Sequence, residues 1–154
     1  MSKFDLIIRG GTVATASDTF KTDVGVRAGK IVALGHDLGK AERTIEAEGQ
    51  LVLPGGIEAH CHIEQESSTR IMTADDFYSG SVSAAFGGNT TFIPFAAQHR
   101  GQNLRDVIKT AHDRAGSKSV IDYAFHLIIS DPTKNVLWQE LPALIMEGYS
   151  SFKV

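Results

Sequence analysis

Residues 56–63 read Gly-Ile-Glu-Ala-His-Cys-His-Ile, and the turn-forming pair Pro54-Gly55 stands directly before them. The segment suits an extended strand, in which successive side chains point to opposite faces. That alternation predicts a polar face that carries Glu58, His60 and His62. The opposite face is predicted to pack under helices and comprises Ile57, Ala59, Cys61 and Ile63. Because the character of the sequence changes here, the segment separates two predicted domains.

The first domain, residues 1–54, is predicted to be a small β module. Short apolar runs alternate there with glycine-containing turns, and no convincing helical period is present. Residues 24–27 and 31–34 flank the turn Ala28-Gly29-Lys30, a pattern that is typical of a β-hairpin.

The second domain, residues 55–154, alternates strands with helices. Further strands are expected at 90–95, 120–129 and from residue 151, and helices at 73–86, 103–115 and 136–146. Thr73 and Asn103 are the expected N-caps of the first two helices. This alternation indicates βαβ units and a parallel sheet. A barrel of eight such units needs roughly 200 residues or more, so we expect an incomplete barrel from a longer polypeptide.

Composition excludes several classes of protein. The chain has 154 residues, of which 42% are hydrophobic, and this argues for a folded core and against disorder. Its 15 basic and 18 acidic side chains give a net charge of −3 without a basic block, so no nucleic-acid partner is expected. No apolar run approaches the ~18 residues of a membrane span. A single cysteine forbids an internal disulfide, and we expect a cytoplasmic protein.

The two histidines of the decisive segment are candidate metal ligands. Side chains two positions apart on a strand lie about 7 Å from each other, close enough for both imidazoles to reach one divalent ion. Neutral imidazole is the commonest nitrogen ligand of zinc. The alternative is two ordinary histidines on a half-exposed strand. Cys61 lies on the other predicted face, so we expect it to be a small packing residue.

Residues 53–62, Leu-Pro-Gly-Gly-Ile-Glu-Ala-His-Cys-His, resemble the first-strand motif of the cyclic amidohydrolases of the dihydropyrimidinase and hydantoinase type. Supporting stretches lie, in the same order as in that family, at residues 4–11, 73–77, 85–91, 122–126 and 148–153. The similarity therefore runs over essentially the whole chain.

This resemblance implies a β-sandwich, built from both chain ends, beside a (β/α)8 barrel that holds two divalent metal ions. The family's roles assign His60 and His62 to the more buried ion, and Lys153, carboxylated by carbon dioxide, to a bridge between both ions. Two further histidines and an aspartate that acts as general acid and base would lie beyond Val154. Zinc is the expected metal, with manganese or cobalt as alternatives.

The position of Lys153 in the sequence also supports a carboxylated lysine, independently of the resemblance. It stands between Phe152 and Val154 on a strand that is expected to be buried, where an ammonium group is costly. Burial favours the neutral amine, which is the form that attacks carbon dioxide. The alternative is a lysine that reaches into solvent from the end of a strand.

Other residues are assigned to the surroundings of the metals or to the substrate. Glu58 stands where the family more often has aspartate, and Glu58 and His126 are expected to support the ligands from a second shell. Gln65 and Phe95 are expected to contact the substrate. The polar loop 64–69 and Pro94 also depart from the family pattern and leave the substrate open.

The resemblance implies an enzyme that hydrolyses a cyclic amide, opening a dihydropyrimidine or a 5-substituted hydantoin to an N-carbamoyl amino acid. The partner is then a small cyclic amide, and the full-length protein is expected to be a homotetramer. The 154 residues alone are not expected to be active. Alternatives are an allantoinase, a dihydroorotase or an imide hydrolase, a non-catalytic scaffold subunit of this fold, or a small metal-binding or interaction module.

Overall fold

The structure is a computed structural model that describes residues 3–67 and 69–154. The chain forms two compact units, Met1–Pro54 and Gly55–Val154. Each unit has its own sheets and its own buried residues.

The first unit consists of two small mixed sheets. One sheet has the strand order β5-β4-β1-β6, with β1 antiparallel to β4 and parallel to β6. The other has the order β3-β2-β7. The strands are β1 (Phe4–Arg9), β2 (Thr12–Ala14), β3 (Thr19–Lys21), β4 (Asp23–Arg27), β5 (Lys30–Gly35), β6 (Ala41–Glu46) and β7 (Leu51–Val52). The predicted hairpin is confirmed as β4 and β5, with a register shift between Gly25 and Val26.

The core of the first unit forms around Phe4 and Ile7 of β1 and Val24 of β4, all of which are buried. Gly25 makes this packing possible, because a Cβ atom at position 25 would lie 2.6 Å from Cε1 of Phe4. A side chain there would have to displace the ring, and cores tolerate such overpacking poorly.

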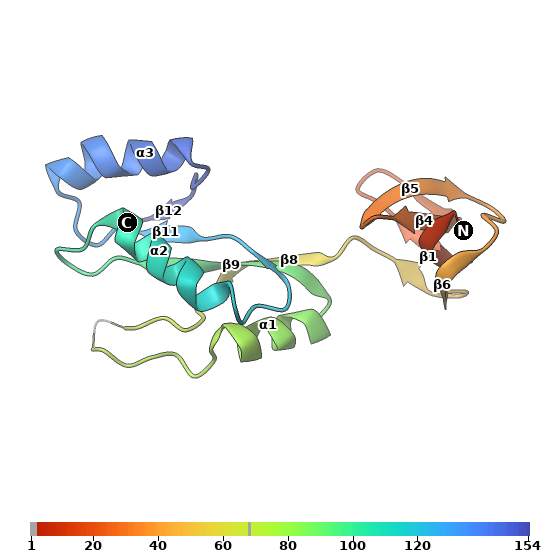
Figure 1. The fold of residues 1–154 in the computed structure, drawn as a ribbon, viewed down its shortest axis with the longest axis horizontal. Coiled ribbons are helices and arrows are strands. Elements are labelled where there is room, and N and C mark those ends of the chain that lie inside the picture. Colours follow the sequence, from red (N-terminus) through yellow and green to blue (C-terminus); the bar gives the residue numbers. More distant parts are fainter. Residues whose placement is uncertain (1–2, 68) are drawn as a thin grey trace. The chain divides into compact units, whose positions relative to one another are not determined.

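The second unit is built on a parallel sheet, as the alternating pattern predicts (Figure 1). Central strand β9 pairs in parallel with β8, β10 and β11, and β11 pairs in parallel with β12. The strands are β8 (Gly56–Cys61), β9 (Asn89–Ala97), β10 (Asp122–Tyr123), β11 (His126–Ile128) and β12 (Phe152–Lys153). The expected strand 120–129 is thus divided into β10 and β11.

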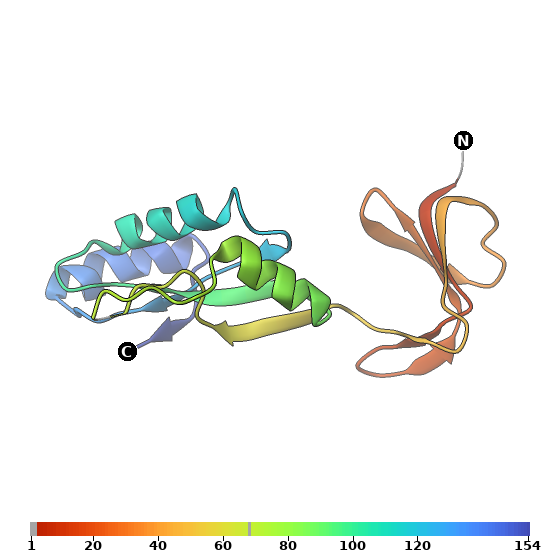
Figure 2. The same cartoon turned by 90° about the horizontal axis from the view of Figure 1, so that it is seen from below.

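Three α-helices cover one face of this sheet (Figure 2). They are α1 (Phe77–Phe86), α2 (Leu104–Ala115) and α3 (Leu141–Met146). The prediction for α2 is confirmed: Asn103 caps it through the backbone N–H of Arg105, and its apolar stripe packs into the core with Phe92 and Leu127. None of the described helices has the length and apolar character needed to cross a membrane.

Two helix starts differ from the predictions. The N-cap of α1 is Asp76 and not Thr73, whose hydroxyl instead accepts the backbone N–H of Gln65. The third predicted helix opens as a π-helical turn, η1 (Val136–Glu140), in which the N–H of Leu141 donates to the carbonyl of Val136. Pro142 follows directly and has no N–H to donate, so a regular α-helical ladder cannot run through this point.

The cap of α1 makes stability depend on pH. The Ser79 backbone N–H and, after it, the Lys118 ammonium lower the pKa of the Asp76 carboxyl below its ordinary value of 3.8. The carboxylate therefore stabilises the folded state fully above pH 3.8, and this contribution is lost as the pH falls through the lowered pKa.

We expect Asp76→Asn to lower the midpoint of thermal unfolding by a few degrees at pH 7. The difference from wild type should shrink as the pH falls below 3.8. Unfolding curves of the whole protein between pH 7 and pH 3 measure it, with the exposed Asp122→Asn as the control for loss of one charge. A difference that stays constant over this range would contradict the expectation.

Candidate metal centre

A register shift in β8 decides where the side chains of the decisive segment lie. Ile57 pairs with Thr91 and Glu58 with Phe92, but Cys61 already pairs with Pro94, so one extra residue of β8 is accommodated between Glu58 and Cys61. Such a bulge interrupts the two-residue alternation of the strand.

The predicted common face of Glu58, His60 and His62 is therefore wrong for Glu58. Its side chain lies on the helix-covered side, where it lines a space with Cys61, Ile63 and Gly80. Its carboxylate accepts the backbone N–H of His60 at 2.8 Å. Glu58 thus supports the strand backbone rather than an imidazole.

The bulge also divides the predicted apolar face, because Ile57 lies before it and Cys61 and Ile63 lie after it. Cys61 and Ile63 pack against the core under the helices, as expected, whereas Ile57 is 62% exposed and shares the register of Thr91. Burial and the nearby Glu58 carboxylate raise the pKa of the Cys61 thiol to about 11. Cys61 packs against the core under the helices, in agreement with its predicted packing role.

His60 and His62 lie together on the open side of the sheet. Their ring centroids are 5.7 Å apart, and both rings contact the ring of Phe95 from β9, at 5.0 Å for His60 and 4.9 Å for His62. His62 is stacked on Phe95, with 18° between the ring planes, and His60 meets it edge-on at 70°. Phe95, which was predicted to contact the substrate, is buried and packs against both imidazoles.

Lys153 reaches the same place from β12. Its Nζ lies 5.0 Å from the centroid of the Phe95 ring. The backbone register explains this position, because Lys153 pairs with Ile128 of β11, and β11 in turn pairs with β9 through His126 and Phe95. Three residues from strands far apart in the sequence, His60, His62 and Lys153, therefore surround one aromatic ring.

The prediction that Lys153 is buried is wrong for the described chain. Phe152 is 38% and Val154 is 96% exposed, and Lys153 is exposed as well. The reason is topological: within residues 3–67 and 69–154, β12 pairs with β11 alone and forms the edge of the sheet.

His126 has partners at both ring nitrogens. Nε2 lies 2.9 Å from the carbonyl oxygen of Ala59, and Nδ1 lies 2.5 Å from Oγ of Ser151. A neutral imidazole satisfies both contacts when Nε2 donates to the carbonyl and Nδ1 accepts from the hydroxyl. His126 thereby joins the residue before His60 to the segment that leads into Lys153. No short-range pattern identifies Ser151 in this role, because 25 positions separate it from His126.

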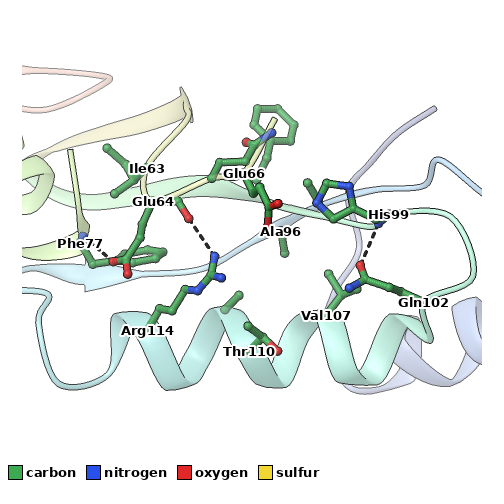
Figure 3. A pocket seen from close by; sticks show the side chains of 14 residues that line it. Ile63, Glu64, Glu66, Phe77, Ala96, His99, Gln102, Val107, Thr110 and Arg114 are labelled. Atoms are coloured by element: carbon green, nitrogen blue, oxygen red, sulfur yellow. Dashed lines mark hydrogen bonds between the residues drawn. The ribbon is translucent and has the colours of Figure 1, made fainter. Parts of the chain in front are cut away.

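Gln65 lies beside His62, with its Oε1 atom 2.6 Å from Nδ1 of the imidazole. The loop that carries it borders a cavity of about 100 Å³ between residues 63–66 and α2 (Figure 3). Arg114 of α2 donates to the Glu64 carbonyl oxygen at 2.9 Å across this cavity. No local sequence pattern identifies this contact, because 50 positions separate Arg114 from Glu64.

Histidine, cysteine and carboxylate side chains alone do not complete a metal site in the part of the chain that the structure describes. No group of three or more of them lies close enough together there to hold an ion.

The known proteins that are similar to this chain agree with one another in name and in fold, although no family model matches the chain. The chain is 45% identical over 150 residues to a D-hydantoinase of Ralstonia pickettii, covering 97% of this chain and 32% of that protein. A solved D-hydantoinase structure superimposes with a TM-score of 0.93 at 44% identity, covering 98% of this chain and 33% of the other. The dihydropyrimidinase of Brevibacillus agri superimposes with a TM-score of 0.89 at 43% identity, covering 96% and 32%.

The chain spans about a third of the length of the curated relatives it matches. In both sequence and fold it corresponds to the N-terminal third of the hydantoinases, which confirms the predicted resemblance to that family.

Proposed function

We propose that this chain is the N-terminal part of a metal-dependent hydrolase that opens cyclic amides, either 5-substituted hydantoins or dihydropyrimidines, to N-carbamoyl amino acids. The observation that carries the proposal is the gathering of His60, His62 and Lys153 around the Phe95 ring. The similarity to D-hydantoinases and a dihydropyrimidinase supports it. The rest of the β-sandwich and of the (β/α)8 barrel would come from sequence beyond Val154.

The residues at the site fit a divalent transition metal. Two adjacent imidazoles from one strand end are nitrogen donors of the kind that zinc prefers. His60 and His62 would hold one ion, and Lys153 would bridge it to a second. When bound, such a pair of ions supplies a nucleophile from water at neutral pH and polarises the amide carbonyl.

Lys153 would serve this site as a carbamate. Its neutral amine attacks the carbon of carbon dioxide, a nitrogen–carbon bond forms, and one proton leaves to solvent. The product is an anionic group with two oxygen atoms, which suits two neighbouring cations better than an ammonium does. The proton that the leaving ring nitrogen needs would come from an aspartate beyond Val154, so the 154 residues alone should not complete the reaction.

We expect EDTA to abolish ring opening by the intact protein. The intact protein here is the product of the complete reading frame that contains this chain. Zinc or manganese added afterwards should restore ring opening, because the nucleophile and the polarised carbonyl both depend on the ions. Turnover of a 5-substituted hydantoin and of dihydrouracil measures this, with allantoin and dihydroorotate as comparison substrates. Hydrolysis that persists undiminished after chelation would overturn the proposed mechanism.

A further inference from the structure

The hydrogen bond between Gln65 and His62 has a defined direction. The Oε1 atom of an amide can only accept, so Nδ1 of His62 must be the donor at 2.6 Å. A neutral imidazole that donates from Nδ1 keeps its lone pair on Nε2. We propose that Gln65 is a positioning residue that holds His62 in this form, with Nε2 free to bind a metal. The inference rests on the proposed function and adds a role that the metal ligands themselves do not reveal.

Two contacts together fix the His62 ring. Stacking on Phe95, with 18° between the planes, sets the plane in which the imidazole lies. Stacking alone still allows the ring to flip about its Cβ–Cγ bond, which exchanges Nδ1 with Cδ2, and the hydrogen bond from Nδ1 to Gln65 selects one of these two orientations. Outer partners of this kind commonly set the tautomer and direction of a metal-bound histidine.

The backbone of Gln65 is fixed by two hydrogen bonds to Thr73. Its N–H donates to Oγ1 of Thr73 at 3.1 Å, and its carbonyl accepts the N–H of Thr73 at 3.0 Å. The side chain therefore starts from a fixed backbone position in the loop between β8 and α1, and is only partly exposed.

The preceding residue, Glu64, anchors this loop to the helices. Both carboxylate oxygens accept from the Lys118 ammonium at 2.8 Å, and one also accepts the backbone N–H of Phe77 at 3.2 Å. The Glu64 side chain is only 18% exposed, so water screens this ion pair less than one on the open surface. Arg114 binds the Glu64 carbonyl in addition (Figure 3).

The backbone of Glu64 agrees with such an anchor. Its φ angle is +45°, a conformation that residues other than glycine adopt rarely and keep only where the surrounding structure holds them. Glu64 thus turns the chain directly after His62 and Ile63, and the turn brings Gln65 back against the imidazole. This arrangement assigns Gln65 to His62, whereas the sequence suggested a contact with substrate.

Zinc affinity of the intact protein tests the proposal without relying on turnover. Gln65→Leu keeps the approximate size of the side chain but removes the acceptor, and we expect zinc to bind about 10- to 100-fold more weakly. Gln65→Glu keeps an acceptor and should restore the affinity to within a few-fold of wild type. Glu66→Gln, a polar change at the next loop residue, is the matched control and should leave zinc affinity unchanged. Competition with a chelator gives the dissociation constants, and thermal unfolding checks that each variant is folded.

The outcomes distinguish a wrong role for Gln65 from a wrong proposed function. Zinc affinity that is unchanged in a folded Gln65→Leu variant, with KM for the hydantoin raised, would assign Gln65 to the substrate and overturn its positioning role. Equal losses in Gln65→Leu and Gln65→Glu would overturn it as well, because the second variant retains the acceptor. A wild-type protein that binds no zinc, manganese or cobalt would instead overturn the proposed function.

Discussion

Replacement of His60 or His62 by asparagine is expected to lower kcat/KM for hydantoin opening by the intact protein by about 10³-fold. Each histidine is a proposed ligand of the same ion, and loss of metal activation costs several kcal/mol of transition-state stabilisation at about 1.4 kcal/mol per tenfold change in rate. Asparagine is smaller and polar, so it should be accepted on the open side of the sheet, where both histidines are exposed.

Metal content should fall together with activity in both histidine variants. Elemental analysis of the purified protein measures it, and His36→Asn in the first unit controls for the loss of a histidine elsewhere. Either site variant with more than about a tenth of wild-type activity would contradict the assignment of that histidine, since a lost ligand should cost more than one factor of ten.

Lys153→Met should also remove activity, by about 10³-fold, and should lower the number of bound metal ions per chain. Methionine has a similar length but no amine that could react with carbon dioxide. Lys153→Arg should fail equally, because the guanidinium remains charged at any pH at which proteins fold and does not become a neutral nucleophile. The exposed Lys30→Met change in β5 controls for the loss of one positive charge.

Labelled bicarbonate distinguishes a carbamate from an ordinary ammonium at this position. Wild-type protein equilibrated with ¹³C-bicarbonate should show a carbamate carbon resonance that is absent from Lys153→Met. A fully active wild-type protein without this signal would show that Lys153 acts as an amine, and the bridge between two ions would then need another ligand.

Local features of the sequence predicted much of the second unit. The apolar spacing of residues 104–115 and the cap at Asn103 gave a helix that the structure confirms. The parallel pairing of β9 with its neighbours follows from the alternation of strands and helices. These features depend on residues a few positions apart, whose backbone preferences and side-chain spacing act within one element.

Caps and breaks were less well predicted where two local signals compete. Thr73 and Asp76 both suit an N-cap, and the choice fell to Asp76 because the Thr73 hydroxyl is bound to the Gln65 backbone. The expected strand 120–129 is broken after Tyr123, and Phe125 in the break is buried with the helices. Both outcomes depend on partners from other parts of the chain.

The sequence by itself determined that His60 and His62 stand at the end of a strand, two residues apart, in a chain of βα units. Only the tertiary structure decided that a bulge turns Glu58 to the helix side, that Gln65 faces His62, and that Lys153 and both histidines contact the ring of Phe95. The physical reason is that side-chain alternation is a property of one strand, whereas register, bulges and edge exposure arise from hydrogen bonds between strands. Those bonds join residues that no local pattern relates to one another.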